Sequence, residues 1–149
     1  FISRDNARTP YQWDDTENAG FTAGTPWLKV NQRYPEVNLK ADLASEDSVF
    51  RFYQKVIAFR KEHPAVVDGD LTFLLPEDTK TVIYTRKCAR ECILVFTNHS
   101  DTETGIELPE EILSHSWKEA LTNRKDGALR TELPTVLEPW EASLFTLSC

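Results

Sequence analysis

The residues best suited to chemistry stand in one short stretch near the start of the chain, RDNARTPYQWDD, residues 4–15. Arg4 and Arg8 are four residues apart, and Asp5 and Asn6 lie between them. A guanidinium is planar and always charged, so it binds a carboxylate through two N–H groups while another N–H reaches a hydroxyl. The neighbouring carboxylate and amide suit the adjacent hydroxyls of a sugar ring. We therefore expect Arg4, Asp5, Asn6 and Arg8 to form a ligand-binding loop.

Aromatic residues add apolar surface to the same stretch. Tyr11 and Trp13 offer ring faces on which the C–H surface of a sugar can rest. A second interpretation is that Arg4 and Arg8 simply brace the loop through ion pairs. The two interpretations are compatible, because one arginine can hold a carboxylate that itself binds the ligand.

The carboxylates and histidines of the sequence do not form a recognisable catalytic group. Glycoside hydrolysis needs two carboxyl groups, about 5 to 5.5 Å apart in retaining enzymes and further apart in inverting ones. Adjacent side chains on a helix or strand do not converge on one point. The carboxylates that are neighbours in sequence are therefore expected to be solvated turn or cap residues: Asp14–Asp15, Glu46–Asp47 and Glu110–Glu111. No histidine has a serine or cysteine partner at a suggestive spacing, so we expect no catalytic residue in this chain.

Three cysteines, Cys88, Cys92 and Cys149, are too few and too scattered for a disulfide framework. Cys88 and Cys92 flank a predicted hairpin turn, and a reduced pair in a cytoplasmic protein is the favoured interpretation. No second Cys or His pair stands at ligand spacing. We expect no metal site and no cofactor.

Composition narrows the class of protein further. The 149 residues are 40% hydrophobic and 28% charged, with a formal net charge of −7, which is typical of a soluble globular chain. Acidic chains repel phosphate backbones, so nucleic acid is not an expected partner. No apolar run has the length of a membrane helix, and no membrane partner is expected. The chain opens on Phe1 and contains no methionine, which indicates a processed form or a segment of a longer protein.

Two kinds of structure are predicted to follow the opening stretch. The first forty residues read as irregular, and their aromatics need a packing surface outside this chain. A long helix is predicted from Ser45, as its N-cap, to His63, with Pro64 ending it and an apolar stripe interpreted as core. Seven short strands follow: 71–75, 81–85, 92–98, 104–108, 116–122, 129–133 and 141–147. Their spacing favours an antiparallel sandwich or Greek-key module.

The segments SRDNARTP and QWDD, followed by NAGFTAGTPW and VNQRYPEVNL, closely resemble the α-amylase superfamily, glycoside hydrolase family thirteen. The branch resembled is that of the oligo-1,6-glucosidases, which also holds trehalose-6-phosphate hydrolases and sucrose isomerases. Tyr11 stands where the family usually has Met. The resemblance continues through the helix and the β module, so it covers essentially the whole chain.

The resemblance implies a fold that is mainly β. Residues 1–64 would be the C-terminal end of a catalytic (β/α)8 barrel, with its long active-site loop and last helix, and residues 65–149 a C-terminal β-sandwich domain. The rest of the barrel would be the missing partner. The family's nucleophile and acid/base carboxylates lie upstream of this motif, so none transfers to this chain. Arg4 would pair with an upstream Asp and bind the non-reducing glucose, while Asp5, Asn6 and Arg8 shape the loop.

The function implied is that of a C-terminal fragment of a retaining α-glucosidase. Its substrates would be short α-glucosides such as isomalto-oligosaccharides, and the fragment alone would be inactive. The alternative is a non-catalytic β-sandwich that binds carbohydrate or a protein partner. Such a module needs exposed aromatics, and its only candidates among the β-domain tryptophans, Trp117 and Trp140, are as easily core.

Overall fold

The computed structural model describes residues 4–148, and the backbone forms two compact units, Phe1–Lys55 and Val56–Cys149. None of the helices in the described part combines the length and the apolarity that crossing a bilayer demands.

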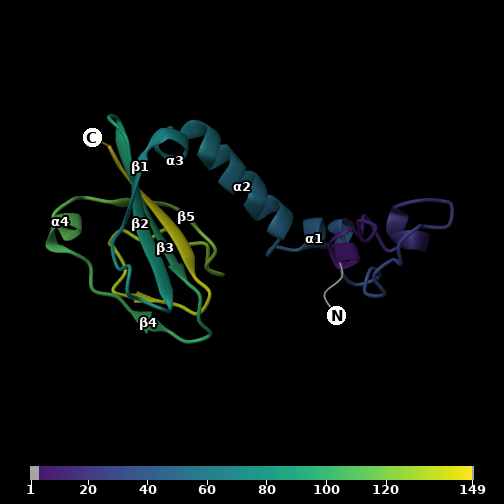
Figure 1. Ribbon diagram of the computed structural model, residues 1–149. Helices are drawn as coiled ribbons and strands as arrows, with labels where there is room; N and C mark the ends of the chain where they lie inside the picture. The colour runs from purple at the N-terminus through teal and green to yellow at the C-terminus, as the bar shows by residue number, and fades with distance from the viewer. Residues whose placement is uncertain (1–3, 149) are drawn as a thin grey trace. The chain divides into compact units, whose positions relative to one another are not determined.

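The first unit is mostly loop, as the sequence predicts (Figure 1). It contains two 3-10 helices, η1 (Arg4–Ala7) and η2 (Glu17–Gly20), and a short helix that was not predicted, α1 (Leu39–Ala44). The side chain of Asn38 caps α1 by accepting a hydrogen bond of 2.8 Å from the Ala41 N–H. Asn38 is one of the favoured N-cap residue types, so this helix start had a signal in the sequence.

The long helix α2 (Val49–Glu62) begins three residues later than predicted. Ser45 is not its N-cap. Ser48 Oγ accepts from the Arg51 N–H at 3.1 Å, and the Asp42 carboxylate accepts from the Val49 and Phe50 N–H groups at 3.0 Å each. The Asp42 carboxylate, which belongs to α1, therefore accepts the free N–H groups in the first turn of α2. The residues of α2 alone do not indicate this cap, because the acceptor lies in another helix.

The apolar stripe of α2 is not core within the described residues, contrary to the sequence-based interpretation. None of its residues is buried, and Val49, Tyr53 and Ile57 are about half or more exposed. A helix with this much exposed apolar surface is typical of an interaction face.

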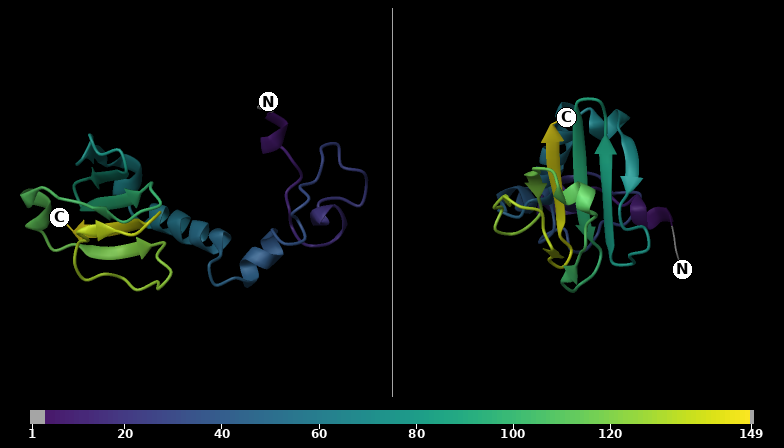
Figure 2. Two further views of the ribbon diagram at one scale, coloured as in Figure 1. Left: turned by 90° about the horizontal axis from the view of Figure 1, so that it is seen from below. Right: turned by 90° about the vertical axis from the view of Figure 1, so that its left-hand side faces the viewer.

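The second unit is built on antiparallel sheets (Figures 1 and 2). Its large sheet has the strand order β1-β2-β3-β7-β5, and a small second sheet pairs β4 with β6. The strands are β1 (Asp70–Phe73), β2 (Thr81–Lys87), β3 (Glu91–Asn98), β4 (Thr104–Gly105), β5 (Lys118–Thr122), β6 (Val136–Leu137) and β7 (Ala142–Ser148). Two short helices complete it, α3 (Ala65–Asp68) and α4 (Glu110–Leu113). The predicted antiparallel β-sandwich is confirmed.

Strand β3 lies at the centre of the large sheet because it is apolar on both faces. Leu94 and Phe96 join one buried cluster, in which Phe96 meets Phe145 edge-to-face at 5.4 Å between ring centroids. Ile93 and Val95 join a second cluster with Ala65. A continuous apolar run is what a strand covered on both sides requires.

One predicted strand, 129–133, does not form. The Arg130 N–H donates to the buried carboxylate of Glu119 instead of to a neighbouring strand, and the chain pairs only at 136–137. The hairpin between β2 and β3 forms as predicted, with the Cys88 N–H donating to the Glu91 carbonyl at 3.0 Å. Cys88 is a free thiol, so it forms no disulfide across that hairpin, and Cys149 lies outside the described residues.

Candidate functional site

The predicted binding residues lie on and beside η1, the first turn of the described chain. Arg8 pairs with the carboxylate of Asp5, and its N–H donates to the Asp5 carbonyl at 3.0 Å, which closes this turn. One of the two arginines therefore braces the loop, as the second interpretation of the charges requires. Arg4 and Asn6 are exposed on the same turn.

The aromatic part of the loop is held against the start of α1. Tyr11 and Trp13 contact each other edge-to-face, with ring centroids 4.7 Å apart, and about half of each side chain is exposed. The Gln12 carbonyl accepts from the Leu39 N–H at 2.9 Å, and the Trp13 carbonyl accepts from the Lys40 N–H at 3.0 Å. These backbone bonds fix two irregular segments side by side and leave the aromatic rings at the surface.

A run of left-handed backbone closes the next turn. Asn18, Ala19 and Gly20 have φ values of 55°, 60° and 65°. Left-handed φ is uncommon for a residue with a side chain, and for Ala19 it costs free energy unless the surroundings hold it. Ala19 is fully buried, and its carbonyl accepts from the Trp13 N–H at 2.9 Å. The turn thus fixes the backbone that carries Trp13.

The adjacent carboxylates of the loop are turn residues, as predicted. The hydroxyl and then the N–H of Thr16 bond to Asp14 and lower the pKa of its carboxyl group. The ion pair between Asp15 and Lys40, 2.8 Å from Oδ1 to Nζ, lowers the pKa of Asp15 and raises that of Lys40. Both carboxylates are therefore ionised structural groups, and neither has the raised pKa of a general acid.

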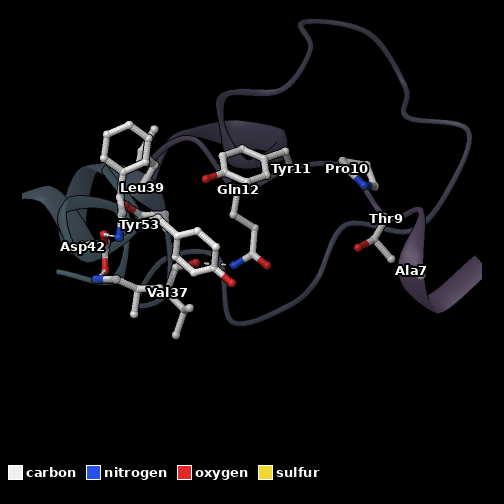
Figure 3. A pocket seen from close by; sticks show the side chains of 12 residues that line it. Ala7, Thr9, Pro10, Tyr11, Gln12, Val37, Leu39, Asp42 and Tyr53 are labelled. Atoms are coloured by element: carbon white, nitrogen blue, oxygen red, sulfur yellow. Dashed lines mark hydrogen bonds between the residues drawn. The ribbon is translucent and has the colours of Figure 1, made fainter. Parts of the chain in front are cut away.

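A cavity of about 720 Å³ opens between the loop and the N-terminal turn of α2 (Figure 3). Its walls carry Tyr11, Gln12, Val37, Phe50 and Tyr53, and the amide of Gln12 donates to the Val37 carbonyl. Ala7 and Thr9 reach its edge.

The four predicted site residues do not line this cavity, although Ala7 lies among them in sequence. Sequence reasoning also missed Val37, Phe50 and Tyr53 as lining residues. The aromatic content of α2 was the available signal for the last two, but it was assigned to the core. With its mainly apolar walls, the cavity suits packing of another apolar surface better than acid/base chemistry.

No metal centre is apparent in residues 4–148, where no three His, Cys, Asp or Glu side chains gather closely enough to hold an ion.

Two known families match the chain. Residues 1–69 match the family described as alpha amylase, catalytic domain, and residues 71–144 match the maltogenic amylase C-terminal domain. Among curated relatives, the chain is 45% identical over 148 residues to an oligo-1,6-glucosidase of Parageobacillus thermoglucosidasius, covering 99% of this chain and 26% of the relative. It is 38% identical to a trehalose-6-phosphate hydrolase of Bacillus subtilis (strain 168), covering 98% and 26% of the two chains. The chain therefore spans about a quarter of the length of these relatives.

Solved structures of the same group superimpose on the chain. An isomaltulose synthase from Klebsiella sp. LX3 has a TM-score of 0.86 at 35% identity, covering 97% of this chain and 26% of that one. A trehalulose synthase from Pseudomonas mesoacidophila MX-45 has a TM-score of 0.82 at 36% identity with the same coverage.

Proposed function

Because this chain belongs to the α-amylase superfamily, we propose that it is the C-terminal part of a retaining α-glucosidase that hydrolyses short α-glucosides, such as isomalto-oligosaccharides. The observation that carries the proposal is the 45% identity to an oligo-1,6-glucosidase over 99% of the chain. The proposal divides the chain at residues 64 and 65, between the end of a (β/α)8 barrel and a β domain.

Arg4 is the residue to which we assign substrate binding. It is exposed on η1, and among the described residues no hydrogen bond or ion pair engages its guanidinium. Arg8, in contrast, is committed to Asp5 within the same turn. Arg4 would meet a carboxylate from the remainder of the enzyme and, through it, the substrate, while Asp5, Asn6 and Arg8 hold the turn in shape.

The exposed apolar surface of the first unit supports the proposal that the rest of a (β/α)8 barrel packs against it. Tyr53 and Val49 are more than 60% exposed, and with Phe50 they border the apolar cavity. Exposed apolar surface of this extent is unfavourable in water and marks a surface that another structure covers. In the proposed enzyme the preceding barrel strands and helices cover it.

The test compares the chain alone with the same chain joined to its upstream reading frame. Purified full-length protein is expected to release glucose from isomaltose and from an aryl α-glucoside, whereas the 149-residue chain releases none above a buffer blank. The reason is that positioned carboxylates supply most of the rate in this chemistry. Turnover by the chain alone would contradict the assignment of catalysis to residues upstream, and a full-length protein inert on both substrates would contradict the proposed function.

A further inference from the structure

Trp140 occupies a turn position that favours glycine. The turn runs from Glu138 through Pro139 and Trp140 to Glu141, closed by a 3.2 Å hydrogen bond from the Glu141 N–H to the Glu138 carbonyl. Proline at the second position and a positive φ at the third define a type II turn, which normally has Gly or Asn third. Trp140 has φ 58°, and 61% of its surface is exposed.

Several side chains hold this strained turn in place. Asn98 Nδ2 donates to the Glu138 carbonyl at 2.8 Å, and Asn123 Nδ2 donates to the Trp140 carbonyl at 2.9 Å. The buried carboxylate of Glu141 accepts from the Glu138 N–H at 2.9 Å. Strained residues persist where the surroundings over-determine them, and they concentrate at ligand sites. The fold thus presents a large aromatic ring to solvent on a rigid support.

A cavity of about 260 Å³ lies beside the ring. Its lining residues are Asn123, Arg124, Lys125, Glu138, Pro139, Trp140 and Glu141. Pockets for drug-sized ligands begin at roughly 300 Å³, so this one suits a single small ring.

Arg124 lines this cavity with a side chain that the buried carboxylate of Glu119 holds, at 3.1 Å from Nη2 to Oε2. Its side chain is 6% exposed, and its Nε is buried without a hydrogen-bond acceptor among the described residues, because Asp126 Oδ1 is 3.9 Å away. Because Nε is buried, a ligand oxygen does not reach it, and Arg124 contributes a fixed charged wall to the cavity.

The charges of the lining residues select the ligand class. Arg124 and Lys125 contribute two positive charges, and Glu138 and Glu141 contribute two negative ones. Because these charges cancel, the cavity has no general preference for anions or cations. An exposed aromatic face beside several donors and acceptors fits a neutral molecule with C–H faces and hydroxyl groups. We propose that this cavity binds one sugar unit of a neutral saccharide, with the Trp140 ring against its C–H face. Arg4 is not among the residues that line this cavity, and occupancy of the cavity does not depend on hydrolysis.

The test measures binding of isomaltose to the 149-residue chain by saturation-transfer NMR and by the shift of the Trp140 indole N–H. We expect a saturable shift with a millimolar dissociation constant and no shift with inorganic phosphate. Trp140→Gly relieves the turn while removing the ring, so it is expected to keep or raise the Tm and to weaken isomaltose binding by about tenfold or more. Trp27→Gly is the matched control, since Trp27 is 91% exposed and lies outside the cavity, and it is expected to leave binding unchanged.

Three results would overturn the proposal. These are no saturable isomaltose shift at Trp140, a shift produced equally by phosphate, and a Trp140→Gly variant that binds isomaltose like the parent chain. If Trp140→Gly lowers the Tm, Trp140→Asn, which also accepts positive φ, replaces it in the binding measurement. Because the assay involves no turnover, its failure leaves the proposed hydrolase function standing.

Discussion

Gly20 lies directly against the carboxylate of Asp14: a Cβ atom added at position 20 would stand 2.6 Å from Asp14 Oδ1. Gly20 also has φ +65°, a conformation that side chains disfavour. For both reasons, the loop that carries Trp13 keeps its conformation only if residue 20 has no side chain.

Gly20→Ala is therefore expected to destabilise this loop by about 1–3 kcal/mol. The Trp13 N–H, which donates to Ala19, reports on the loop directly, and its hydrogen exchange is expected to accelerate about tenfold or more. Gly24→Ala is the control, because its nearest neighbour would be Thr22 Oγ1 at 3.7 Å. Equal exchange rates in the two variants would show that the contact with Asp14 does not constrain the loop.

The ion pair between Arg130 and Glu141 is the second target. The buried carboxylate of Glu141 is held by both terminal nitrogens of Arg130, one at 3.1 Å, and by Ser143 Oγ at 2.8 Å. Glu141→Gln leaves the Arg130 guanidinium without its charge partner, so we expect a loss of about 3 kcal/mol in the free energy of unfolding, measured with urea. Glu132→Gln, an exposed position nearby, is expected to change it by less than about 0.5 kcal/mol. A similar loss in both variants would contradict this role.

Lowering the pH is expected to remove the contribution of the Arg130–Glu141 ion pair to the free energy of unfolding. Burial alone would raise the pKa of Glu141, but the hydrogen bonds from Arg130, the Glu138 N–H and Ser143 lower it below the ordinary value. A carboxyl whose pKa is depressed in the folded state stabilises the fold above its unfolded pKa and loses that effect as pH falls through the folded value. The stability difference between the parent and Glu141→Gln is expected to be constant from about pH 7 to 5 and to shrink below about pH 4. If the stability difference between the parent and Glu141→Gln increased as the pH fell, the lowered pKa assigned to Glu141 would be wrong.

The strands were largely predictable because their side chains repeat with the period of a sheet. β2 alternates buried and more exposed residues around Ile83, and β3 is apolar from Cys92 to Phe96. The side-chain pattern does not predict the structure correctly where the backbone forms a hydrogen bond with a side chain that is distant in sequence. Segment 129–133 alternates like a strand, yet the Glu119 carboxylate takes the Arg130 N–H. The first turn of α2 is likewise completed by Asp42 from the preceding helix.

The sequence predicted which types of residue the candidate site contains, but it did not predict which of them contact one another. The density of charge at Arg4, Asp5 and Arg8 identified a polar loop, but only the structure shows that Arg8 is the arginine paired with Asp5. The left-handed run ending at Gly20 has a single glycine to suggest it. Trp140 was equally a core candidate in the sequence, because its exposure depends on a turn held by Asn98 and Asn123, which are distant along the chain.

The measurement that tests the central claim most directly is the rate of isomaltose hydrolysis by full-length enzyme carrying Arg4→Lys, compared with Arg33→Lys. Lysine keeps the charge and loses the planar, two-pronged grip on a carboxylate. Arg33 is exposed; its backbone N–H donates to Asn31 Oδ1 at 3.0 Å, and no hydrogen bond or ion pair engages its guanidinium among the described residues. We predict that kcat/KM falls by about 100-fold for Arg4→Lys and stays within about twofold for Arg33→Lys. If Arg4→Lys hydrolyses isomaltose as fast as the parent enzyme, Arg4 does not bind the substrate and the account of this loop is wrong.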